Sequence, residues 1–148
     1  MQKQQLIQAC KDHFKSKITS LNTIINEVTE SSNGESKSSA GDKHETSKAM
    51  MQLEIEKLGN QLKEAEEQLA EFEKINFNKS PQSIEQGSLV QTDKGYFFIA
   101  GSVGKLTVND QIVFVISNRS PLAVAFSGKQ KGESISFNDV LYSVVSVF

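Results

Sequence analysis

The chain has 148 residues, a formal net charge of -2, one cysteine and two histidines. A general DNA or RNA binder presents a clearly basic surface, so this charge excludes broad, charge-driven nucleic-acid binding. The single cysteine, Cys10, excludes an intrachain disulfide framework, and no apolar run is long enough to cross a bilayer. We therefore expect a cytoplasmic protein with no membrane segment and no sequence-specific DNA binding.

Composition changes sharply near Ser80-Pro81. Residues 1–79 contain no proline and are rich in Gln, Glu, Lys and Leu, which are good helix formers, whereas both prolines and most glycines follow. Proline disfavours helix at the residue before it. The sequence therefore predicts an α+β protein with two domains, a helical one at 1–79 and a mixed one at 80–148.

The helical domain carries two series of apolar residues that step by three and four. Such spacing is typical of a coiled-coil seam. The first series is Phe14, Ile18, Leu21, Ile25 and Val28, and Ile7 extends it toward the N-terminus. The second series is Met51, Ile55, Leu58, Leu62, Ala65, Leu69 and Phe72.

Between the two seams, Thr29 to Gly41 is rich in Ser, Asn and Gly, and we expect it to interrupt the helix. Two seam-bearing helices joined by one loop predict an antiparallel coiled-coil hairpin with its tip near 29–46. Each helix of about 30 residues would be roughly 45 Å long. A continuous parallel dimer is the alternative. We expect Cys10 to be buried between packed elements. We expect Met50 and Met51 to lie in the seam and fill gaps in it.

The second domain reads as short β-branched and aromatic runs separated by turn residues. Asn138-Asp139 suits a tight hairpin turn, and Pro121 can occupy the first turn of a short helix. We predict a small antiparallel sheet with strands at 89–92, 96–100, 111–116, 134–137 and 140–147, and a helix at 121–126.

Two motifs, the first in the helical domain and the second in the mixed domain, resemble motifs of the bacterial Gre-type transcript-cleavage factors. Gly41-Asp42-Lys43-His44-Glu45 resembles the family's Gly-Asp-x-x-Glu. Residues 120–133, Ser-Pro-Leu-Ala-Val-Ala-Phe-Ser-Gly-Lys-Gln-Lys-Gly-Glu, resemble its Ser-Pro-(Leu/Ile)-(Ala/Gly)-x-Ala-Leu-x-Gly-Lys…Gly-Asp stretch. The likeness extends from about Gly41 to Phe148, and over residues 1–40 only the helical character agrees.

The resemblance implies an accessory factor without catalytic activity of its own, whose partner is RNA polymerase. It implies an FKBP-like second domain that docks at the polymerase's secondary channel, with Ser120, Pro121 and Leu122 as the candidate docking residues. It also implies that Asp42 and Glu45 act in the polymerase active site, as shared ligands of its second Mg²⁺. There they would promote hydrolysis of the backtracked RNA 3′ end.

The chemistry of these residues agrees with that role. Two-metal phosphodiester hydrolysis requires ions about 3.5–4 Å apart, and Mg²⁺ takes few protein oxygens and keeps several waters. Asp42 and Glu45, three residues apart at a helix start, can point the same way. The same spacing is also close to a capping box, in which both side chains bind the backbone.

Other features leave alternatives open. Lys11, Lys15 and Lys43 are candidates for lying near RNA, although lysine is also the usual coiled-coil flank. The family follows its glutamate with Asn-x-Glu-Tyr, whereas here Thr46-Ser47-Lys48-Ala49 follows. A channel-binding regulator that does not stimulate cleavage is therefore one rival, and a coiled-coil scaffold is another. No nucleophile set, phosphate-binding loop or metal cluster at usable spacing indicates an independent enzyme.

Overall fold

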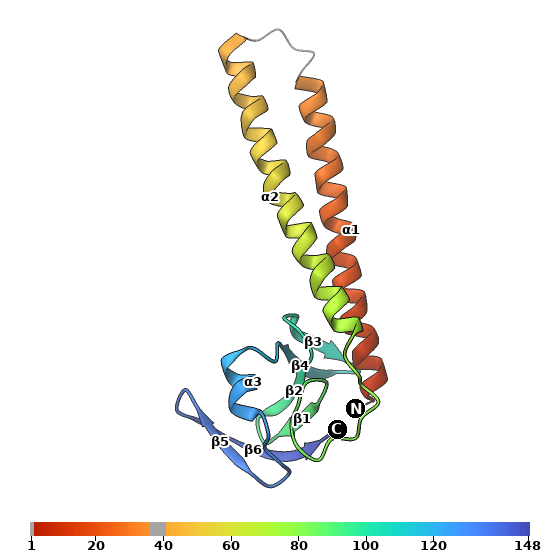
Figure 1. The fold of residues 1–148 in the computed structure, drawn as a ribbon, viewed down its shortest axis with the longest axis vertical. Helices are drawn as coiled ribbons and strands as arrows, with labels where there is room; N and C mark the ends of the chain where they lie inside the picture. The colour runs from red at the N-terminus through yellow and green to blue at the C-terminus, as the bar shows by residue number, and fades with distance from the viewer. Residues whose placement is uncertain (1, 36–40) are drawn as a thin grey trace. The chain divides into compact units, whose positions relative to one another are not determined.

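The computed structural model describes residues 2–35 and 41–148 (Figure 1). Contacts divide the chain into two compact units, one formed by Met1–His13 with Ala70–Phe148 and the other by Phe14–Leu69. We call them the sheet unit and the helical unit. The predicted boundary between residues 79 and 80 follows composition, whereas these units follow contacts. Both ends of the first 79 residues therefore fall in the sheet unit.

Two long helices precede a six-stranded sheet. One short helix lies in the chain between the fourth and fifth strands. Among the described helices, none combines the length and apolar character needed to cross a membrane. In chain order the elements are α1 (Lys3–Glu35), α2 (Gly41–Glu73), β1 (Leu89–Thr92), β2 (Gly95–Ile99), β3 (Gly104–Val108), β4 (Gln111–Ile116), α3 (Pro121–Phe126), β5 (Ser134–Phe137) and β6 (Val140–Val147).

In the helical unit, α1 and α2 lie side by side (Figure 1). Their contact centres on Leu21, Leu58 and Ala65, which are at most 8% exposed. Ile18, Ile25, Val28 and Leu62 pack around this cluster. Every residue of the two predicted seams is buried or half-buried, because steps of three and four keep a side chain on one helical face.

The predicted break at Thr29–Gly41 is wrong over most of its length. Helix α1 continues through Thr29 to Glu35, and α2 already begins at Gly41. Adding one residue to an existing helix requires no new nucleus, so Ser, Thr and Asn can extend a helix that they would not start. Residues 36–40 lie outside the described residues.

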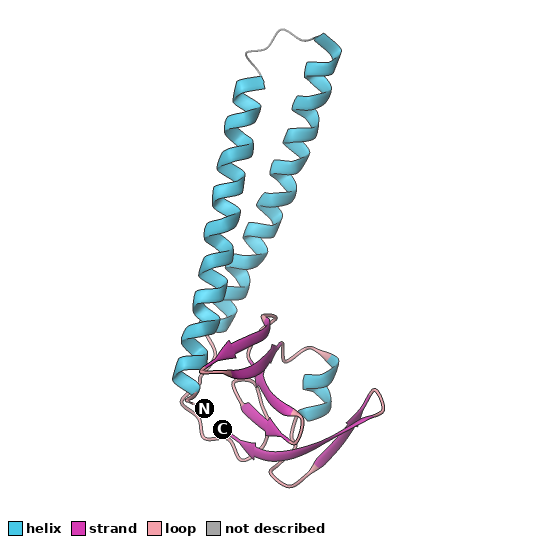
Figure 2. Cartoon of the chain, turned by 180° about the vertical axis from the view of Figure 1, so that it is seen from behind, coloured by secondary structure: helices cyan, strands magenta, loops and turns pink. Residues whose placement is uncertain are grey.

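The sheet has the strand order β3-β4-β2-β1-β6-β5 and is mixed (Figure 2). The prediction of a wholly antiparallel sheet is wrong, because β2 and β4 pair in parallel, with Phe97 opposite Phe114. The cause is β3, which the sequence reading missed. It runs antiparallel to β4 at the edge of the sheet, so the chain reaches β4 already turned back to the direction of β2.

Both faces of the central strands are covered within the sheet unit. On one face, Val90 and Phe97 pack with Ala123 and Phe126 of α3. On the other face, Phe98 contacts Phe77, whose ring centroid lies 5.5 Å away, and Phe77 contacts Phe72 at 5.2 Å. The alternation of β2 side chains thus places Phe97 in one layer and Phe98 in the other.

Two Asn-Asp pairs close the β3–β4 and β5–β6 hairpins. Asn109 and Asp110 have φ of 51° and 62°, and Asn138 and Asp139 have φ of 49° and 63°. Asn and Asp tolerate this left-handed conformation, which two-residue hairpin turns require. The tight turn predicted at Asn138-Asp139 is confirmed, since Phe137 pairs directly with Val140.

Candidate functional site

The predicted acidic pair lies in the first turns of α2. Asp42 is the second residue of this helix and Glu45 the fifth. Glu45 is exposed, as are Thr46, Lys48 and Ala49. The side chains of residues 41–44 lie outside the described residues, so the predicted orientation of Asp42 and the predicted role of Lys43 stay predictions.

The described side chains at this end of α2 fit a partial rather than a complete magnesium site. Glu45 offers a solvent-exposed carboxylate, a hard oxygen donor of the kind that Mg²⁺ prefers. Across the side chains that the structure describes, no three His, Cys, Asp or Glu residues gather closely enough to hold a metal ion. A magnesium site formed by Asp42 and Glu45 with ligands from a partner stays a prediction.

The predicted docking motif begins the short helix α3. Ser120 is its N-cap: the Oγ accepts a hydrogen bond from the Ala123 N–H at 3.4 Å and donates one to the Ser117 carbonyl at 2.7 Å. Pro121, at the first helical position, needs no N–H partner there. Leu122 is half-buried and packs against the core of the sheet unit. Ser120 and Leu122 thus have structural roles in α3.

The exposed surface of α3 includes residues that the sequence reading did not select. Val124 is 61% exposed and is the most exposed large aliphatic side chain on α3. Pro121 and the neighbouring Arg119 are also exposed. The available signal was the helical spacing: Ala123 and Phe126 face the core, which turns Val124 outward.

The two lysines predicted on the first helix lie one helical turn apart on α1. Lys11 is half-buried and Lys15 is exposed. Their predicted proximity to RNA stays a prediction.

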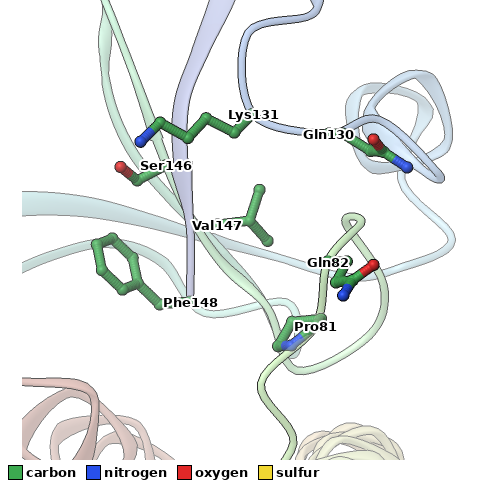
Figure 3. A pocket seen from close by; sticks show the side chains of 7 residues that line it. All are labelled: Pro81, Gln82, Gln130, Lys131, Ser146, Val147 and Phe148. Carbon is green, nitrogen blue, oxygen red and sulfur yellow. The ribbon is translucent and has the colours of Figure 1, made fainter.

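Two polar cavities lie within the sheet unit. The first, of about 450 Å³, is lined by Pro81, Gln82, Gln130, Lys131, Ser146, Val147 and Phe148 (Figure 3). The second, of about 300 Å³, places Arg119 and Lys74 beside Glu71, Gln86, Ser117 and Asn118. Both linings offer amide, hydroxyl and charged side chains that can form hydrogen bonds with a polar ligand.

Comparisons with known proteins include a weak likeness to a solved structure. No protein-family model and no curated protein matches the chain. Among solved structures the chain is similar to GreA factor homolog 1 (Gfh1) of Thermus thermophilus, with 16% sequence identity and a TM-score of 0.36. The similarity covers 96% of this chain and 92% of that one. A TM-score at this level does not establish a shared fold.

Proposed function

We propose that the chain is an accessory transcription factor that binds RNA polymerase through its secondary channel and stimulates cleavage of backtracked RNA. The observation that carries the proposal is the placement of the two Gre-like motifs. Gly41–Glu45 starts the second of two long helices, and residues 120–133 form α3 with the segment that leads into β5. In this proposal α1 and α2 form an antiparallel coiled-coil hairpin, and the sheet unit is the FKBP-like docking domain.

In the proposed mechanism, Asp42 and Glu45 complete the coordination of a magnesium ion that belongs to the polymerase. Asp42 and Glu45 would hold this ion beside the polymerase's other magnesium ion, and the two ions together would supply water activation and stabilisation of the leaving oxygen. Two carboxylates bind Mg²⁺ weakly alone and well once other carboxylates complete the shell. This supports an accessory role rather than an independent enzyme.

The test is RNA cleavage in stalled elongation complexes with wild type and Asp42→Ala/Glu45→Ala. We expect wild type to accelerate cleavage and the double variant to lose the acceleration. Glu64→Ala/Glu67→Ala is the matched control, because it removes two exposed carboxylates at the same spacing on the same helix. Equal stimulation by wild type and the acidic-pair variant would show that the metal role is wrong.

A second candidate is a channel-binding regulator that alters polymerase activity without cleavage. It is favoured by exposed Lys48 and Ala49, which stand where the family has an acidic and an aromatic residue. A lysine near the carboxylates reduces the negative charge available to a cation. Copurification with polymerase and slowed elongation, with no cleavage, would select this function.

The proposed docking surface is the outer side of α3, where Pro121 and Val124 are exposed. We expect Val124→Glu to weaken copurification with polymerase, because a buried unpaired charge opposes binding. Val145→Glu is the control, since Val145 is also exposed, at 42%, but lies on β6. Equal copurification by both variants would exclude α3 as the docking element, whereas failure of the wild type to copurify with polymerase would favour the scaffold interpretation.

A further inference from the structure

The helical unit contains an apolar groove with an acidic border. The groove has a volume of about 470 Å³ and is lined by Val28, Met50 and Met51 together with Glu27, Ser31 and Glu54. A volume of this order is within the range of ligand-binding pockets. All six residues belong to the helical unit and come from α1 and α2.

The groove forms because the seam between the helices is no longer closed there. Leu21 and Leu58 are 8% and 6% exposed, whereas the seam positions beyond them toward the groove, Ile25 and Val28 on α1 and Ile55 and Met51 on α2, are only half-buried. Beside them, Met50 is 66% exposed, although we had expected it to fill a gap in the seam. The neighbouring Leu53 is 65% exposed. Apolar surface of this extent in an otherwise polar helix pair indicates an interaction site.

The charge around the groove is one-sided. From Ile18 to its end at Glu35, α1 carries three glutamates and no Lys, Arg or His. Glu27 and Glu54 are both exposed, and among the described residues neither carboxylate has an ion-pair partner. Lys48 and Lys57, the nearest lysines along α2, do not line the groove. An occupant would thus meet an apolar floor and two exposed carboxylates.

We propose that this groove binds a cationic amphipathic helix of a protein partner. The partner's apolar side chains would contact Val28, Met50 and Met51 and continue the coiled-coil seam as a third helix. Its Lys or Arg side chains would pair with Glu27 and Glu54. Helices recognised in grooves present apolar residues at i, i+3, i+4 and i+7, and methionine side chains adapt their shape to such partners. The inference goes beyond the polymerase role and does not depend on it.

The test uses the full chain labelled with ¹³C at its methionine methyl groups. The sequence has three methionines, so Met50 and Met51 report on the groove while Met1 is an internal reference. The probe is a Leu/Lys peptide of about four amphipathic helical turns, and the matched probe is a Leu/Glu peptide of the same length. We expect the Leu/Lys peptide to shift the Met50 and Met51 signals saturably and the Leu/Glu peptide to bind much more weakly.

Charge-reversal variants then separate the contribution of the acidic border to peptide binding from that of the apolar floor. Glu27→Lys/Glu54→Lys is expected to weaken binding of the Leu/Lys peptide about tenfold and to strengthen binding of the Leu/Glu peptide. Glu64→Lys/Glu67→Lys, which changes the same charge outside the groove, should leave both affinities nearly unchanged. Circular dichroism of each variant establishes that the helices remain folded.

Three results would overturn the proposal. The first is equal binding of the two peptides, which would indicate apolar attraction without charge recognition. The second is peptide binding that leaves the Met50 and Met51 signals unmoved, which would place the site elsewhere. The third is a shift of these signals with protein concentration in the absence of peptide, which would make a second copy of the chain the occupant.

Discussion

At the scale of single residues, the turn between β1 and β2 shows how one carboxylate is held by its surroundings. Asp93 Oδ1 accepts a hydrogen bond from the Ser143 N–H at 2.8 Å, and Lys94 Nζ lies 3.1 Å from Asp93 Oδ2. These two partners, the Ser143 N–H first, lower the pKa of Asp93 below its ordinary value of 3.8. Through Ser143 the turn is fixed to β6, although the residues are distant in sequence.

Because the pKa of Asp93 is lower in the folded state, its carboxylate stabilises the fold above the unfolded-state pKa. This contribution is lost as the pH falls through the folded-state pKa. We therefore expect Asp93→Asn to flatten the acid side of the curve of unfolding free energy against pH. Lys94→Met should leave part of the lowering of the Asp93 pKa, since the Ser143 N–H still donates a hydrogen bond to the carboxylate. An NMR titration that gives Asp93 an unfolded-like pKa would contradict this account.

Cys10 provides a second prediction at this scale. Its side chain is fully buried in the sheet unit, and this burial raises the pKa of the thiol from 9.0 to about 12. Since the thiolate is the reactive form, we expect iodoacetamide at pH 8 to leave Cys10 unmodified in the native protein. The same reagent should modify it in guanidinium chloride. Modification at equal rates in both conditions would show that the first turns of α1 do not bury this thiol.

At the scale of elements, the seam spacing separates buried from exposed leucines on α2. Leu58 is 6% exposed and Leu53 is 65% exposed. We expect Leu58→Ala to lower the free energy of unfolding of the helical unit by about 2–3 kcal/mol, because truncation leaves a cavity between the helices. Leu53→Ala should change it by about 0.5 kcal/mol or less. Denaturant unfolding followed by circular dichroism measures both, and equal effects would mean that the seam is misplaced.

The same scale shows what sequence patterns predict and what they miss. The seams, α3 and five of the six strands follow from local periodicity and turn residues, which act within a few residues. The strand β3 was missed because Gly104-Lys105-Leu106-Thr107-Val108 has only two large apolar residues and lies at the sheet edge, with one neighbour. Its omission also caused the error in strand direction, since strand pairing is a non-local property.

For the candidate site, sequence reasoning could locate motifs but could not determine exposure. It selected Ser120 and Leu122, which the structure places in a helix cap and against the core. The exposure of Val124 follows from helical spacing only once Ala123 and Phe126 are known to face the core, and the groove beside Met50 depends on how two helices pack, which no local pattern contains. The place of Asp42 and Glu45 at the start of a helix could be predicted, because a helix start has its own sequence signature.

At the scale of the whole molecule, the start of the chain and the end of α2 belong to the sheet unit. Leu6 and Cys10 are fully buried, and the Phe72–Phe77–Phe98 ring contacts connect the end of α2 to β2. A domain boundary drawn from composition at residues 79 and 80 therefore separates side chains that share one core. The proline signal at Pro81 indicates the end of helical composition, not the end of packing.

This arrangement predicts that residues 80–148 alone are much less stable than the same residues in the full chain. Without Phe72, Phe77 and the start of α1, the face of the sheet that carries Leu89 and Phe98 becomes exposed. Exposing two large apolar side chains costs roughly 3–6 kcal/mol, comparable with the roughly 5–15 kcal/mol of a whole domain. We expect the fragment's amide NMR spectrum to be poorly dispersed. A dispersed spectrum with full-chain stability would instead support an independent domain beginning near residue 80.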